Sequence, residues 1–203
     1  MHAVVFDIDG TLVQSVEVDE ILYKHSIRSI VGDVEFRPKW SDYESVTDSG
    51  ILSQVLEDNS VEPSPSQTRQ IEANFFASLQ AHISNTGPFT EIPGAKAYLE
   101  KLGSSRNHGV AIATGGWRAS AELKLISAGF DLKGVPTATS SESSDRTKIM
   151  KIAASRLGHN FDSITYYGDG VWDRDACVEL GWKFVPVGGA LSGISSYHGV
   201  DVA

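Results

Sequence analysis

Apolar residues at the start of the chain form an almost unbroken run that stops at acidic residues. The segment "HAVVFDIDGTLV" (residues 2–13) carries small, β-branched and aromatic side chains from Ala3 to Phe6. A continuous apolar run is typical of a strand covered on both faces of a parallel sheet. The pattern predicts a strand over residues 3–8, with Asp7 and Asp9 at its carboxyl end.

From residue 89 onward, short β-prone runs alternate with helix-like segments. Runs that close with Gly or Ser predict strands at 109–116, 134–140, 163–170 and 182–189. The neighbouring stretches predict helices at 94–102, 118–128, 146–157 and 173–180. This alternation is typical of α/β units around a parallel sheet. We therefore expect an α/β fold with a Rossmann-like core of five parallel strands.

Residues 14–88 follow a different pattern. Segments 15–31, 48–59 and 66–83 carry apolar residues at three- and four-residue spacings, which indicate amphipathic helices, and no strand-like run separates them. The helical unit interrupts the α/β pattern directly after the first strand. We expect an inserted α-helical domain of residues 14–88 and a core domain made of residues 1–13 and 89–203. Asp48 or Ser49 is the expected N-cap of the second helix.

Composition narrows the function classes. The 203 residues include 17 basic and 26 acidic side chains, and the resulting net charge of −9 disfavours nucleic acid as a partner. No apolar stretch approaches 18 residues, and no secretory signal is visible, so a membrane partner is not expected. Cys177 is the only cysteine, which fits a cytoplasmic location. The chain could be a monomer or a homodimer.

Candidate chemistry collects at the carboxyl ends of the predicted strands, where open α/β sheets bind ligands. Three strands end in polar or glycine residues: Asp7 and Asp9, Thr114 to Gly116, and Asp169 and Asp173. Acidic side chains at one edge suit Mg²⁺, and a hydroxyl followed by glycines at a helix start suits a phosphate. Each short motif alone is also compatible with an ordinary polar turn.

Taken together, four segments resemble, in order and spacing, the motifs of the haloacid dehalogenase-like (HAD) superfamily of phosphotransferases. They are "DIDGT" at the first strand, "ATGG" at the second, the region of Arg146 and Lys148, and "GDGVWD" at the fourth strand. The resemblance covers nearly the full length of the chain. It is strongest with the branch of phosphoglycolate phosphatases and β-phosphoglucomutases, which implies a HAD-like core with a helical cap.

The resemblance implies a role for each matching residue. Asp7 would be the nucleophile that carries an aspartyl-phosphate, and Asp9 the general acid and base. The third motif lacks the Lys-Pro pair of many relatives, so the catalytic cation would be Arg146 or Lys148, with Arg146 favoured. The remaining roles would belong to phosphate-binding residues, Thr114, Gly115, Gly10 and Thr11, and to Mg²⁺ ligands, the side chain of Asp7, the backbone carbonyl of Asp9, Asp169 and Asp173.

The resemblance therefore implies a Mg²⁺-dependent phosphatase that hydrolyses a small phosphorylated metabolite. A sugar phosphomutase of the β-phosphoglucomutase type is the alternative enzyme, and a phosphate-binding relative without catalysis is the alternative outside enzymes. Asp9 argues against dehalogenases and phosphonatases, which lack an aspartate two residues after the nucleophile. The cap would choose the substrate, and within it residues 40–50 are candidates for substrate contact.

Overall fold

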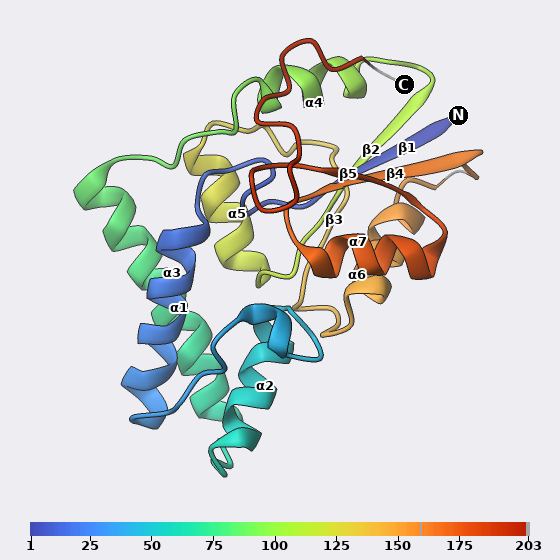
Figure 1. The fold of residues 1–203 in the computed structure, drawn as a ribbon. Coiled ribbons are helices and arrows are strands. Elements are labelled where there is room, and N and C mark those ends of the chain that lie inside the picture. The colour runs from blue at the N-terminus through green and yellow to red at the C-terminus, as the bar shows by residue number, and fades with distance from the viewer. Residues whose placement is uncertain (159, 202–203) are drawn as a thin grey trace.

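A five-stranded parallel sheet forms the centre of the molecule. The computed structural model describes residues 1–158 and 160–201. The strands are β1 (His2–Phe6), β2 (His108–Ala113), β3 (Thr137–Ala138), β4 (Ser163–Gly168) and β5 (Lys183–Pro186), in the spatial order β3-β2-β1-β4-β5 (Figure 1). Their register is parallel throughout, as in the pairs of Val4 with Val110 and with Thr165. The expected α/β fold is confirmed.

Side chains of β1 alternate between two apolar layers, which explains why the strand is apolar on both faces. The helices of the sheet are α4 (Ala95–Gly103), α5 (Arg118–Ser127), α6 (Arg146–Ser155) and α7 (Val171–Leu180). Val4 and Phe6 belong to the cluster that contains residues of α4 and α5. Val5 belongs to the cluster that contains residues of α6 and α7. Burial on both sides removes water from the sheet and stabilises the parallel pairing.

The strand expected at 134–140 is much shorter than the pattern indicates. Only Thr137 and Ala138 pair with β2, at Ile112 and Ala113. Pro136 lies just before them and has no N–H to donate to a ladder, although its carbonyl accepts the Ile112 N–H at 2.8 Å. An edge position suits this interrupted segment, because only one neighbour requires hydrogen bonds.

Three helices and one short turn of 3₁₀ helix lie between β1 and α4. They are α1 (Val16–Val31), η1 (Trp40–Asp42), α2 (Asp48–Asp58) and α3 (Pro65–Thr86). Helix α3 starts at a capping box, in which Ser64 accepts the Gln67 N–H and Pro65 occupies the first helical position. The N-cap of α2 is Thr47, whose hydroxyl accepts the Gly50 N–H at 3.1 Å. The expectation of Asp48 or Ser49 was wrong by one or two residues.

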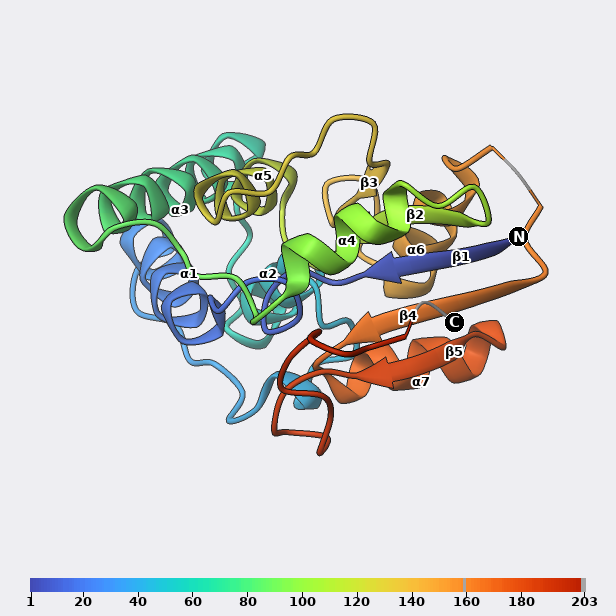
Figure 2. The same ribbon diagram turned by 90° about the horizontal axis from the view of Figure 1, so that it is seen from above.

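The helical unit packs directly on the carboxyl end of the sheet. In Figure 2 the arrow of β1 points toward this unit, and α3 runs beside α5. Tyr23 of α1 and Phe75 of α3 contact Trp117 at ring centroid distances of 5.5 Å and 6.0 Å. One apolar cluster therefore extends from the sheet into the helical unit. Among the described residues, no helix combines the length and apolar content needed to cross a membrane.

Candidate functional site

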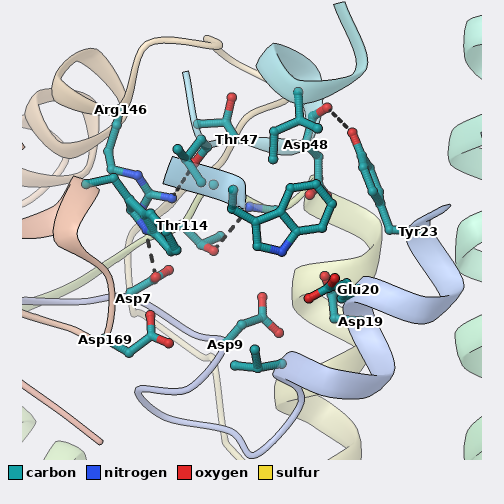
Figure 3. Close-up of a pocket in the computed structure, with 17 residues that line it drawn as sticks. Asp7, Asp9, Asp19, Glu20, Tyr23, Thr47, Asp48, Thr114, Arg146 and Asp169 are labelled. Carbon is teal, nitrogen blue, oxygen red and sulfur yellow. Dashed lines mark hydrogen bonds and ion pairs between the residues drawn. The ribbon is translucent and has the colours of Figure 1, made fainter. Parts of the chain in front are cut away.

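A pocket of about 120 Å³ lies between the carboxyl end of the sheet and the helical unit. The sheet side contributes residues that follow β1, β2 and β4, as the sequence predicts, together with Arg146 at the start of α6. The helical unit contributes residues from α1, the 40–47 loop and α2. Figure 3 shows the labelled carboxylates and Arg146 arranged around one space.

Asp7 lies at the base of this pocket. Its exposed fraction is 5%, and its Oδ1 is buried with no hydrogen-bond partner among the described residues. Burial, followed by the charge of Asp173, raises its pKa well above the usual range, although Arg146 opposes this shift. A buried carboxylate oxygen without a partner is costly. Asp7 is therefore poised for a ligand that would satisfy this oxygen.

Arg146 and Lys148, the two alternatives for the third motif, point in different directions. The Nη1 of Arg146 lies 2.8 Å from Asp173 Oδ1 and 3.7 Å from Asp7 Oδ2. In contrast, the Lys148 side chain is 68% exposed, and its Nζ lies 3.5 Å from Asp145. The structure brings Arg146 into the pocket and leaves Lys148 on the surface, which agrees with the preference for Arg146.

Three carboxylates form a group that could hold a divalent cation. Asp7, Asp169 and Asp173 each offer one oxygen within 4.8 Å of the other two. Burial and the charges of Asp173 and Asp9 raise the pKa of Asp169 to about 7. Asp173 is partly compensated already, because it accepts hydrogen bonds from Arg146 and the Gly170 N–H. Asp7 and Asp169 are therefore the members of the group most in need of a positive charge.

The expected phosphate-binding residues are divided between the pocket and its surroundings. Thr114 and Gly115 line the pocket, and a side chain at Gly115 would overlap with the Arg146 guanidinium. Gly10 adopts a φ of +71°, and a Cβ there would overlap with Asp169. Thr11 is fully buried outside the pocket lining, and its hydroxyl has no hydrogen-bond partner among the described residues. Gly10 and Thr11 therefore shape the turn after β1 and lie outside the pocket lining.

The comparison with protein families gives a match over most of the chain. The model of haloacid dehalogenase-like hydrolases matches residues 1–181. The chain belongs to this family. No curated protein sequence matches it.

Solved structures of similar fold carry different names. A hydrolase from Pseudomonas syringae has a TM-score of 0.73 at 19% identity, over 92% of this chain and 84% of its own. The β-phosphoglucomutase of Clostridium difficile has a TM-score of 0.71 at 17% identity, with the same coverage. CbbY from Rhodobacter sphaeroides, in complex with phosphate, has a TM-score of 0.66 at 16% identity, over 98% and 90%. Similarity at these identities establishes the fold alone.

A buried lysine that the sequence reasoning missed contacts Asp9 of this HAD-like hydrolase. Lys124 of α5 has an exposed fraction of 0%. Its Nζ lies 2.6 Å and 2.7 Å from the two oxygens of Asp9 and 2.5 Å from Asp19 of α1. Burial alone would lower the pKa of Lys124, but the charges of Asp19, Asp9 and Asp48 raise it above its usual range. The ammonium is therefore charged, and it joins the core to the helical unit.

A signal for Lys124 was present in the sequence. Ala121, Leu125 and Ala128 mark the apolar side of α5, and Lys124 falls on the same side. A lysine on the buried side of a helix requires negative partners. That pattern predicts a buried ion pair but does not identify its partners, because Asp9 and Asp19 come from distant segments of the chain.

Residues 40–50, the candidates for substrate contact, do reach the pocket. Trp40, Val46, Thr47 and Asp48 belong to its lining. This segment is also bonded to the core, since the Asp48 N–H donates to the Gly115 carbonyl at 2.8 Å and Arg146 Nη2 donates to the Val46 carbonyl at 2.7 Å. The helical unit is thus held over the pocket by contacts with the same residues that form its base.

Proposed function

We propose that the protein is a Mg²⁺-dependent phosphatase that hydrolyses a small phosphate monoester through an aspartyl-phosphate at Asp7. The observation that carries the proposal is the buried Oδ1 of Asp7, which lacks a partner and lies in a pocket that also holds Arg146, Thr114 and Gly115. The phosphate in the related CbbY structure fits the same chemistry. Membership of a hydrolase family favours transfer to water.

In the first half of the reaction, an oxygen of Asp7 attacks phosphorus and the bond from phosphorus to the alcohol oxygen breaks. Asp9 gives a proton to the departing oxygen, so the alcohol leaves neutral and the phosphoryl group stays on Asp7. Arg146, with Thr114 and the backbone N–H groups that follow, would stabilise the charge on the phosphoryl oxygens. Ser15 and Lys124 hold the carboxylate of Asp9 beside the pocket.

In the second half, Asp9 accepts a proton from water, and the water oxygen attacks phosphorus. The bond between phosphorus and Asp7 breaks, and inorganic phosphate is released. Asp7, Asp169 and Asp173 would hold Mg²⁺, with the backbone carbonyl of Asp9. The bound ion would lower the repulsion between these carboxylates and the phosphate.

Magnesium should stabilise the folded protein more at pH 8 than at pH 5. Burial raises the pKa of Asp169 to about 7, so the folded state binds this proton more tightly than the unfolded chain does. The metal-free protein therefore loses stability as the pH rises from about 4 to about 7. Mg²⁺ needs the ionised carboxylate and restores that stability by binding. Thermal unfolding with EDTA or Mg²⁺ at both pH values measures the effect, and an equal Mg²⁺ shift at both would contradict it.

Phosphate release from p-nitrophenyl phosphate tests the proposed function. We expect release that requires Mg²⁺ and stops with EDTA. Conversion of glucose 1-phosphate into glucose 6-phosphate without phosphate release would instead favour a phosphomutase, the activity named in one related structure. Absence of both reactions with Mg²⁺ bound would favour a phosphate-binding role without catalysis.

A further inference from the structure

The pocket has two sides of opposite electrostatic character. Arg146 lies on the phosphoryl side, next to Thr114 and Gly115. Across the pocket, the charged side chains that the helical unit contributes are all carboxylates: Asp19, Glu20 and Asp48 (Figure 3). Among the described residues that line the pocket from the helical unit, none is Lys, Arg or His. The alcohol part of a substrate would therefore face carboxylates.

The nearby ammonium groups compensate these carboxylates only in part. Lys124 is divided between Asp9 and Asp19, and Lys24 lies 2.6 Å from Glu20. The Asp48 carboxylate accepts the Trp117 N–H at 2.8 Å. Among the described side chains, only two ammonium groups, those of Lys24 and Lys124, are thus available to neutralise four carboxylates: Asp9, Asp19, Glu20 and Asp48. Burial, followed by the charge of Asp19, raises the pKa of Asp48 well above its usual range, as expected for a carboxylate short of positive partners.

Aromatic rings and the size of the pocket add two further restrictions. Tyr23, Trp40 and Trp172 line the same space, and aromatic faces attract organic cations. Trp40 already does so within the protein, because Lys24 Nζ lies 4.7 Å from its ring centroid. The pocket volume is about 120 Å³, and a cavity of about 150 Å³ holds a molecule the size of benzene. A phosphoryl group with a short alcohol chain is of this size, whereas a sugar bisphosphate is much larger.

We propose that the substrate is the phosphate monoester of a short amino alcohol, with its ammonium group against Asp19, Glu20 and Asp48. This inference rests on the phosphatase function proposed above. An ester with a carboxylate or a second phosphate would place like charges together, which strongly disfavours binding. The helical unit therefore selects for a positive charge and against a second negative one.

The experiment compares kcat/KM with Mg²⁺ for three esters of similar size: 2-aminoethyl phosphate, propyl phosphate and 2-phosphoglycolate. We expect 2-aminoethyl phosphate to exceed propyl phosphate by about tenfold and 2-phosphoglycolate by about 100-fold, the ratios produced by modest charge interactions. Equal or faster hydrolysis of 2-phosphoglycolate would overturn the inference and leave the phosphatase standing. Failure to hydrolyse any of these esters or p-nitrophenyl phosphate would overturn both.

A variant with its matched control assigns the selectivity to the pocket. Glu20→Gln removes one lining carboxylate and releases Lys24, so the preference for 2-aminoethyl phosphate over 2-phosphoglycolate should fall about tenfold. Glu17→Gln makes the same change on the exposed side of α1, outside the pocket lining. It should keep the ratio of the unaltered enzyme. An unchanged ratio in Glu20→Gln, or an equal fall in both variants, would overturn the proposal.

Discussion

Replacement of Asp7 by Asn should abolish phosphate release while leaving the fold intact. The neutral amide cannot attack phosphorus, and loss of a covalent nucleophile costs on the order of 10⁵-fold or more in kcat. Asp7 is buried in the pocket and its Oδ1 has no hydrogen-bond partner among the described residues, so the substitution breaks no hydrogen bond at that atom. Release of p-nitrophenol under single-turnover conditions measures the loss.

The same substitution should make the metal-free protein more stable, which separates a chemical defect from a folding defect. Burial and the charge of Asp173 raise the pKa of Asp7, so its ionised form is disfavoured in the folded state. Without metal, this cost grows with pH, and Asn removes it. We expect a higher Tm for Asp7→Asn in EDTA at pH 8. A lower Tm together with lost activity would contradict this account, and Asp175→Asn, exposed on α7, serves as the control.

Replacement of Lys124 by Met should cause the largest loss of stability of any single change at the site. Met fills a similar volume, but the change leaves the partly buried carboxylates of Asp9 and Asp19 without their fully buried ammonium partner. Removing one partner of a buried ion pair costs about 3–5 kcal/mol. For a domain of this size, that loss lowers Tm by about 10 °C. Thermal and urea unfolding measure it.

Two controls identify the cause of that loss. Lys148→Met removes an exposed ammonium and should change stability by less than about 0.5 kcal/mol. The deficit of Lys124→Met should also shrink between pH 8 and pH 5, because Asp19 has a pKa of about 6 even beside Lys124 and takes up a proton more readily without it. A deficit that does not change with pH would indicate lost packing, and would contradict the ion-pair interpretation.

The strands of the sheet could be predicted because each one is specified by a short, contiguous segment of the sequence. Each strand is a short β-prone run that closes at a glycine, a serine or an acidic residue, and the periodicity changes clearly at the helical unit. The predictions were wrong where neighbouring segments of the fold determine the length of a strand or the N-cap of a helix. The strand at 134–140 is reduced to Thr137 and Ala138 at the sheet edge, and Thr47 caps α2 in place of Asp48 or Ser49.

The pocket was predictable mainly on the side formed by the sheet, and on the helical side only for residues 40–50. The carboxyl ends of parallel strands share one edge, so Asp7, Thr114 and Asp169 could be expected to converge. The contacts of Asp9 could not be derived in this way. Acidic side chains at this edge of the sheet indicated a bound cation, Mg²⁺, but part of the positive charge comes from Lys124, on a helix far along the chain. Such pairings depend on how the helical unit packs on the sheet, and local patterns do not record that packing.

Trapping of the phosphorylated enzyme tests the central claim most directly. The protein is mixed with Mg²⁺ and a rapidly hydrolysed monoester, quenched in acid and treated with borohydride, which reduces an aspartyl-phosphate to homoserine. Peptide mass spectrometry then locates the modified residue. The account predicts homoserine at position 7 and none in Asp7→Asn. Modification of another carboxylate, such as Asp169, or phosphate release with Asp7 never modified, would contradict it.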